Sequence, residues 1–311
     1  MSQSALEVVK AGPLTLLQDS GRFGLAPFGI TTGGPADEYA FSWANHLLEN
    51  SPECATLEIT LGPAVFIAQS DCHLALCGAQ MNAKIDGTAV TNWSEFILKK
   101  GQCLSLSTAR NGLRSYLAVR GGFAVKPQLN SVSCVTREHL GGMHHNGRPI
   151  ASGETVAFHS HTLSRYRGRF VTFRFTPDYN LPLRLRVISG AQFAQFDKQA
   201  VAQFFQSEYH VSTDVNRMGY RLTGPAITPP SHRMQSEGIA LGAIQIPTNG
   251  QPIVLLNDRQ TIGGYPKLGY VARIDLPRLA QAKPGQLVSF VQGDRPGLQA
   301  VWCQWARFFG Y

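Results

Sequence analysis

The sequence predicts a mostly β protein with a few helices, built as two lobes that meet near residue 180. Three observations predict it: a low charged fraction, many short apolar runs bounded by turn residues, and one proline-rich break in that pattern. Charged residues make up 15% of the 311 residues, beside 31 glycines and 18 prolines. Such a composition is typical of strands and tight turns rather than long solvated helices.

Three apolar or alternating runs end at Gly, Pro or Asn and are predicted as strands: 57–61, 115–119 and 253–256. Period-2 or wholly apolar runs between turn signals favour strands. A second pattern, in which a Gly turn and one polar residue precede an alternating strand, occurs at 99–106, 151–158 and 283–290. Its irregular spacing excludes a solenoid and is typical of a unit that a barrel reuses.

Helices are predicted at two places, with a short third. Residues 37–49 carry one apolar face behind Asp37, a plausible N-cap. Residues 192–206 carry a stripe of phenylalanines. A short helix is expected after Asp275, with Pro277 in its first turn. These faces are interpreted as core-facing surfaces.

The internal boundary is placed at residues 175–182, where two prolines interrupt the strand pattern. A new strand is expected from 183 to 188. We therefore predict an N-terminal β lobe over 1–180 and a C-terminal β-barrel lobe over 181–311.

The net charge is +8, from 28 basic and 20 acidic residues. The densest basic cluster lies along an expected strand and is interpreted as a solvated face, or one that meets a partner: Arg165, Arg167, Arg169 and Arg174. No nucleic-acid-binding module is recognisable, so no nucleic-acid partner is predicted. No apolar stretch is long enough to span a membrane, and the N-terminus does not resemble a signal peptide. A cytoplasmic location is therefore expected.

The sequence gives little support for a metal site or for a reactive cysteine. The six cysteines form no C-x-x-C pair and are expected to be buried and reduced. Cys77 lies beside a turn, but a buried thiol is favoured over a nucleophile. His159 and His161 share one face of a strand without an identifiable third ligand, so no metal is predicted. Neither a phosphate-binding loop nor a nucleophile elbow is present.

The first candidate site segment is glycine-rich and spans residues 12–24. Asp19 and Arg22 flank Gly21, close enough to pair or to share a ligand, and a guanidinium offers a planar fork to a carboxylate. The alternative is a loop held by its own Asp–Arg bridge. Arg217, in a later turn before a glycine, is expected to bind an anion or to cap a loop.

The richest segment follows the apolar strand at 253–256. Polar residues and glycines at the end of a buried strand are a usual way to build a rigid site, and here they are Asp258, Arg259, Gln260, Gly263, Gly264, Tyr265 and Lys267. Asp258 is a candidate base, Arg259 a candidate binder of a carboxylate or bicarbonate-like anion, and Lys267 a candidate stabiliser of developing negative charge. The alternative is a buried Asp–Arg bridge that closes a barrel end.

Long motifs in these segments resemble the allophanate hydrolase subunit 2 family. GPLTLLQDSGRFG, followed by GITTGGPAD, is similar to the family's N-terminal signature. RSYLAVRGGF, NRMGYRLTGP and SEGIALGAIQIPTNGQPIVLLNDRQTIGGYPKLG resemble its central and C-terminal parts, so the likeness spans about residues 12 to 290. The chain has NSVSC at 130–134, where the family commonly has G-S-x-S-T.

The resemblance implies a pair of cyclophilin-like β-barrel lobes. It also implies the C subunit of a 5-oxoprolinase, which acts with the A and B subunits in ATP-dependent opening of 5-oxoproline to glutamate. The B subunit resembles allophanate hydrolase subunit 1, and we call it the subunit 1-like partner. Similar sequences belong to the carboxyltransferase region of biotin-dependent urea carboxylase, and others are antagonists of a kinase inhibitor; both stay as alternatives.

The predicted enzyme is therefore a hydrolase subunit that acts on a cyclic amide, inactive without its partners and binding a small carboxylate or amide substrate. ATP is used by the complex, no cofactor is expected on this chain, and biotin enters only under the alternative. The predicted catalytic residues are Asp258, Lys267 and Asp19, with substrate-binding residues Arg22, Arg217, Arg259, Gln260, Gly263, Gly264 and Tyr265. The charged members of this set are expected to line a shared cleft.

Overall fold

A computed structural model describes residues 4–159, 166–231 and 234–311. Residue contacts divide the chain into two compact units. The first consists of Met1–Arg22, Gly33–Tyr179 and Phe309–Tyr311, and the second of Phe23–Thr32 and Asn180–Phe308. The second unit thus includes a short stretch from the N-terminal part of the sequence.

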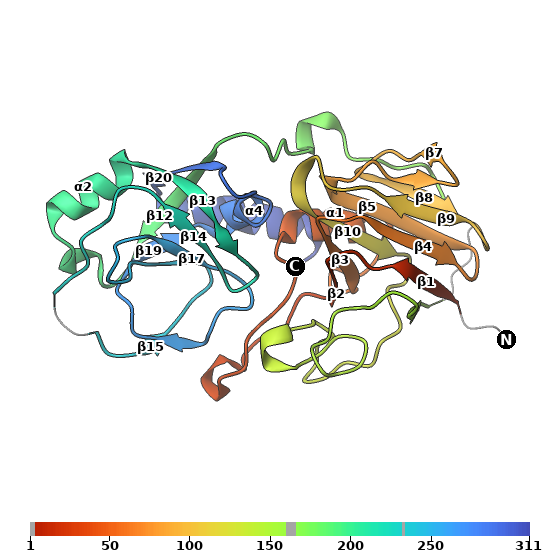
Figure 1. Ribbon diagram of the computed structural model, residues 1–311, viewed down its shortest axis with the longest axis horizontal. Helices are drawn as coiled ribbons and strands as arrows, with labels where there is room; N and C mark the ends of the chain where they lie inside the picture. The colour runs from red at the N-terminus through yellow and green to blue at the C-terminus, as the bar shows by residue number, and fades with distance from the viewer. Residues whose placement is uncertain (1–3, 160–165, 232–233) are drawn as a thin grey trace. The chain divides into compact units, whose positions relative to one another are not determined.

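The first unit contains two antiparallel sheets (Figure 1). In order, the six-stranded sheet contains β11 (Thr155–Ala157), β1 (Ala5–Lys10), β4 (Ala64–Ala68), β9 (Cys103–Leu106), β6 (Lys84–Ile85) and β7 (Thr88–Ala89). The five-stranded sheet contains β2 (Leu14–Gln18), β3 (Thr56–Thr60), β10 (Asn111–Val119), β5 (Cys72–Gln80) and β8 (Ser94–Leu98).

The apolar side chains of both sheets meet in one core, because alternate residues of a strand point to the same face. Helix α1 (Glu38–Leu47) covers the other face of the five-stranded sheet, against β5 and β10 (Figure 1). The side chain of Asp37 accepts the backbone N–H of Ala40 at 2.9 Å, which confirms the predicted N-cap.

The second unit contains a closed seven-stranded barrel. Around it run β12 (Leu183–Ser189), β19 (Lys267–Val271), β16 (Ala243–Gln245), β17 (Ile253–Leu255), β14 (Gly219–Thr223), β13 (Glu208–Val215) and β20 (Leu287–Gln292). The barrel closes through a parallel pair, β12 with β20, and its interior holds a separate apolar core. A two-stranded sheet, β15 (Glu237–Gly238) with β18 (Ile262–Gly263), lies outside the barrel.

Three further α-helices begin in the second unit: α2 (Lys198–Gln206), α3 (Leu276–Ala280) and α4 (Arg295–Phe309). Five 3-10 turns complete the described elements: η1 (Ala26–Phe28), η2 (Thr136–Glu138), η4 (Phe173–Phe175), η5 (Phe193–Gln195) and η6 (Arg273–Asp275).

The prediction of a mostly β chain with a few helices is confirmed. Each of the three predicted Gly turns leads into a strand, and Gly101, Gly153 and Gly285 all have positive φ. The helix expected from residue 192 is shorter than predicted, because η5 occupies its first residues. Helix α4 was not predicted, since Pro296 and Gly297 near its start obscured an apolar stripe that continues to Phe309.

Candidate functional site

Asp19 follows β2 directly and holds the loop at 128–133 in the first unit. Its Oδ1 accepts hydrogen bonds from the hydroxyls of Ser131, at 2.5 Å, and Ser133, at 2.9 Å. Oδ1 also accepts the N–H of Gly21 at 3.0 Å, and Oδ2 accepts the N–H of Val132 at 2.7 Å. The two serines belong to the NSVSC stretch, so this part of the sequence supplies the carboxylate's donors.

Arg22 is 2% exposed and binds the same loop through backbone carbonyls. Its Nη1 donates to Ser133 O at 2.6 Å, Nη2 to Ser131 O at 3.1 Å and Nε to Gln128 O at 3.2 Å. A Cβ at Gly141 would collide with Ser133 O and with Nη2 of Arg22, which explains the glycine there. Asp19 and Arg22 therefore each hold this loop.

Arg217 and Asp258 form a buried bidentate pair in the second unit. Nε and Nη2 of Arg217 each donate to one carboxylate oxygen of Asp258 at 2.9 Å, and both side chains are under 10% exposed. The backbone N–H of Asp258 also donates to Arg217 O at 2.9 Å. A planar guanidinium matches a carboxylate in this way. The predicted Asp–Arg bridge at the barrel end thus exists, with Arg217 rather than the adjacent arginine as partner.

Arg259 lies half-buried beside this pair. Its Nε donates to Ile239 O at 3.0 Å and its Nη1 to Leu256 O at 3.3 Å. Burial lowers the pKa of the Arg259 guanidinium, against an opposing effect from the carboxylate of Asp258. Nη2 makes no hydrogen bond to the described residues.

Lys267 begins β19 and is buried, with a side chain 2% exposed. Its Nζ lies 2.7 Å from Oε1 of Glu237, an ion pair without the alignment of a hydrogen bond. Gln192 joins the two residues: its Nε2 donates to Glu237 Oε1 at 2.7 Å, and its Oε1 accepts the N–H of Lys267 at 2.6 Å. Glu237 is 49% exposed in its side chain, so this buried amine has a solvent-facing partner.

Gln245 lies next to Lys267 on the neighbouring strand. The two residues are opposite one another in the β16–β19 ladder, so their side chains leave the same face. The side-chain nitrogen of Gln245 is buried and has no hydrogen-bond partner among the described residues. A Cβ at Gly263 would lie 3.3 Å from that nitrogen, 2.7 Å from Ile239 Cδ1 and 3.6 Å from Gln260 Nε2. Gly263 therefore allows the chain to approach the Gln245 amide closely.

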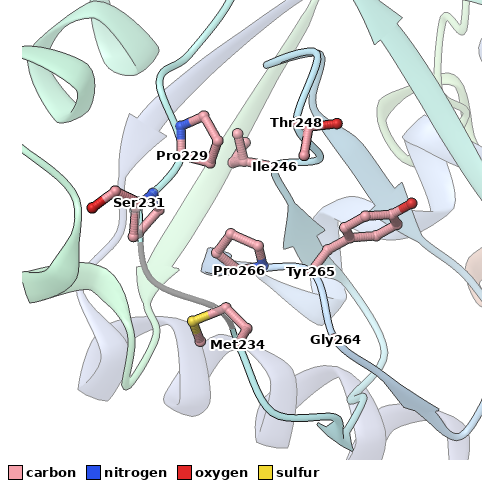
Figure 2. A pocket seen from close by; sticks show the side chains of 9 residues that line it. Pro229, Ser231, Met234, Ile246, Thr248, Gly264, Tyr265 and Pro266 are labelled. Carbon is pink, nitrogen blue, oxygen red and sulfur yellow. The ribbon is translucent and has the colours of Figure 1, made fainter.

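An open pocket of about 490 Å³ adjoins this cluster along the chain. Gly264 and Tyr265, two of the predicted site residues, line it, whereas the predicted charged residues are absent from its lining. Figure 2 shows Tyr265 and Thr248 on one side of the pocket and Ser231 on the other. The remaining lining is apolar: Pro229, Pro230, Met234, Ile246 and Pro266. Such a wall suits a flat, uncharged part of a ligand.

The second unit thus contains the predicted residues from Arg217 to Lys267, in which Arg217 contacts Asp258 and Lys267 lies opposite Gln245. Three partners were missed, namely Gln192, Glu237 and Gln245. A signal existed for Gln245, a polar residue in the apolar run 243–246. Asp19 and Arg22 belong to the first unit, so the shared cleft stays a prediction.

The structure also bears on the Cys77 thiol, on metal ligands and on membrane spans. Burial raises the pKa of the Cys77 thiol well above its ordinary value, which does not favour a nucleophile. Among the described residues, no group of three His, Cys, Asp or Glu side chains could hold a metal ion. His161 and Arg165 lie outside the described residues. None of the helices in the described ranges is both long and apolar enough to cross a membrane.

Comparisons with known proteins match most of the chain, across both units. The sequence profile of the carboxyltransferase domain, subdomain A and B, matches residues 28–292. The 5-oxoprolinase C subunit of Escherichia coli is 36% identical over 92% of this chain and 91% of its own. The crystal structure of TTHA0988 is 31% identical, with a TM-score of 0.84, over 93% of this chain and 56% of that one.

The urea amidolyase of Kluyveromyces lactis is 25% identical, with a TM-score of 0.87, over 99% of this chain. This chain spans only 20% of that protein. The profile match covers well over half of the sequence, and the bacterial relative is similar nearly from end to end. The chain therefore belongs to the carboxyltransferase domain family, subdomain A and B.

Proposed function

We propose that this chain is the C subunit of an ATP-dependent 5-oxoprolinase, which opens 5-oxoproline to glutamate together with the A and B subunits. The name of the Escherichia coli relative supports this proposal. The observation that carries it is the buried pair of donors at the barrel end, the Lys267 amine and the Gln245 amide. We assign ATP binding to another subunit of the complex; this chain has no phosphate-binding loop motif.

Opening a cyclic amide requires water to add to its carbonyl carbon. As the new C–O bond forms, the water loses a proton and the carbonyl oxygen becomes negatively charged; the ring C–N bond then breaks and its nitrogen takes up a proton. Donors placed in advance in a water-poor site stabilise such an oxyanion. Lys267 and Gln245 offer a cation and a neutral N–H from one face of the ladder. We assign both to the oxyanion, with Glu237 and Gln192 as positioning residues for Lys267.

The anionic group of 5-oxoproline itself is its carboxylate, which we assign to Nη2 of Arg259, a donor without a hydrogen-bond partner among the described residues. Asp258 engages Arg217 through both oxygens, so we assign this pair to positioning the turn that carries Arg259. Gln260, Gly263, Gly264 and Tyr265 form the remainder of the substrate-binding surface. Asp19 and Arg22 are assigned to holding the loop at 128–133.

The test is a reconstituted complex of the three purified subunits, assayed for ATP hydrolysis and glutamate formation that depend on 5-oxoproline. We expect Lys267→Met to lower kcat about 10²–10³-fold, the usual effect of removing an oxyanion donor. Lys198→Met, on the exposed side of α2, is the matched control and should keep wild-type turnover. Full turnover in the Lys267→Met complex would contradict the assignment.

Two findings favour one alternative function: the name of the matching family and the similarity to urea amidolyase. In that alternative the chain transfers a carboxyl group from carboxybiotin, presented by a carrier protein, to a urea-like substrate. A biotin carboxylase and a biotin carrier that co-purify with the chain, with urea-dependent and no 5-oxoproline-dependent ATP hydrolysis, would favour it. Tight binding to the subunit 1-like partner without any turnover would instead favour a binding antagonist.

A further inference from the structure

Four residues of the first unit expose charge and aromatic surface on one short stretch: Arg167, Phe170, Phe173 and Arg174. We call this set the basic aromatic edge. Phe170 is 65% exposed and Phe173 is 93% exposed. Large apolar side chains gathered on a surface mark interaction sites, and aromatic residues with arginine are enriched in interface cores.

Hydrogen bonds hold the backbone in the first half of the basic aromatic edge. The buried carboxylate of Glu95 accepts the N–H groups of Arg167 and Arg169 at 3.0 and 2.9 Å. The N–H of Val171 then donates to Trp93 O at 2.8 Å. These bonds attach the stretch alongside β8. Within the described residues 166–174 only an isolated bridge forms, between Ser94 and Phe170, so the strand expected through this part of the basic cluster is wrong.

The second half of the edge is a 3-10 turn, η4, in which Phe175 N–H donates to Thr172 O at 2.9 Å. The hydroxyl of Tyr39 on α1 donates to Phe175 O at 2.6 Å. Phe173 is therefore exposed on a backbone that is bonded to the rest of the unit. A side chain held in this way loses little conformational entropy when a partner covers it.

A pocket of about 400 Å³ lies between the end of α1 and the edge. Trp43, His46 and Leu47 line it from the helix, and Arg167, Gly168, Arg169 and Phe170 from the edge. Edge-on ring contacts hold Trp43, with centroids 5.2 Å from Phe309 and 5.5 Å from His46. Burial, and then the charge of Arg169, lowers the pKa of His46, which favours the neutral ring. The helix side of the pocket is thus uncharged and suits an apolar side chain.

The charge around the pocket is positive. The carboxylate of Glu49 pairs with both Arg120 and Arg169 at 3.0 Å. Arg167 and Arg174 have no ion pair with the described residues, and both are exposed. Their charges therefore remain available to a carboxylate on a partner, and such complementarity steers association and fixes orientation.

We infer that the basic aromatic edge docks an acidic segment of the subunit 1-like partner, which places one apolar side chain in the pocket and a carboxylate against Arg167. The inference rests on the proposed function, from which the partner is taken. A protein segment is favoured over a small molecule because Phe173 and Arg174 are not among the pocket-lining residues. A pocket that takes an anchoring side chain, with exposed aromatic and arginine residues nearby in the chain, is typical of an interface hot spot.

The test is isothermal titration of the purified chain with the purified subunit 1-like partner, at low and at moderate salt. Arg167→Glu and Phe173→Ser should each raise the Kd at least 10-fold, and Arg167→Lys should keep most of the affinity. The wild-type Kd should rise with salt more steeply than that of Arg167→Glu, because salt screens exposed charge pairs. Lys100→Glu, on an exposed turn of the same unit, and Phe28→Ser, on an exposed site of the second unit, are the matched controls.

Wild-type Kd values in both Arg167→Glu and Phe173→Ser, in a complex that still turns over 5-oxoproline, would overturn the edge and leave the proposed function standing. A wild-type chain that neither binds the subunit 1-like partner nor supports turnover would overturn both. If the control substitutions weakened binding equally, the basic aromatic edge would also be contradicted. Such a result would show that overall charge or apolarity affects affinity, wherever on the surface it is changed.

Discussion

Two buried charged clusters, one in each unit, differ in how fully their hydrogen bonds are satisfied. In the first unit, both carboxylate oxygens of Asp19 accept well-formed hydrogen bonds from Gly21, Ser131, Val132 and Ser133. In the second unit, the Lys267 amine has only an unaligned ion pair with a half-exposed glutamate.

This difference in hydrogen bonding distinguishes buried charges that hold the fold from buried charges that can bind a ligand. A buried polar group is normally satisfied by its neighbours, and it then holds the fold in place. A buried donor that its own chain leaves unsatisfied costs free energy, which a ligand can recover. Lys267 and Gln245 are of this second kind, whereas Asp19 is of the first. The two clusters should therefore respond differently to substitution.

The largest loss of stability is expected from Asp258→Asn. The substitution removes the charge of the bidentate partner of the buried Arg217 guanidinium, and removing one partner of a buried pair costs about 3–5 kcal/mol. Urea unfolding should show this loss. Asp214→Asn is the matched control, because its ion pair with Arg221 is more than half exposed on both sides and is worth about 0–1 kcal/mol. Equal losses in the two variants would show that burial does not distinguish them.

A smaller loss, about 1–3 kcal/mol, is expected from Asp19→Asn. An amide in this place would bring a donor against the Val132 N–H or the Gly21 N–H, so at least one buried hydrogen bond is lost. Asp86→Asn is the control, since Asp86 accepts comparable hydrogen bonds at an exposed turn with positive φ, which Asn tolerates. Thermal unfolding of both variants measures the difference. Wild-type stability in Asp19→Asn would contradict the structural role of this cluster.

Gly263→Ala should cost about 1 kcal/mol, the lower end for overpacking, because its Cβ would lie 2.7 Å from Ile239 Cδ1. It should also displace the Gln245 amide and lower the turnover of the reconstituted complex. Gly238→Ala is the control in the paired strand, since its Cβ would meet nothing within 4 Å. That control should be neutral or more stable by about 0.4–1 kcal/mol, as an alanine restricts the unfolded chain. Equal turnover in both variants would show that Gly263 does not contribute to the proposed site.

The smallest change in stability is expected from Lys267→Met. A methionine has a similar length and needs no hydrogen bond, and replacing buried charge by apolar atoms is often neutral or stabilising. We expect the free energy of unfolding to stay within about 1 kcal/mol of the wild type, even though turnover falls. A loss as large as that of Asp258→Asn would show that Lys267 holds the fold, and would break the distinction between the two clusters.

Much of the local structure follows from the sequence alone. The strands, the glycine turns and the cap at Asp37 depend on residues within a few positions of one another, so their patterns are visible in the chain. The same holds for the polar stretch after the strand at 253–256, which the sequence places at a strand end. Family motifs over residues 12–290 added the proposed activity and partners.

Only the tertiary structure decided how the charges are paired. Asp258 takes Arg217, 41 positions away, rather than the adjacent arginine, and Asp19 takes serines more than 110 positions away. Gln245 meets Lys267 because the β16–β19 register shifts next to Gln245. A shift of one residue turns a side chain to the other face of a sheet. Partners of buried charges therefore depend on strand register and barrel closure, which no local pattern of residues specifies.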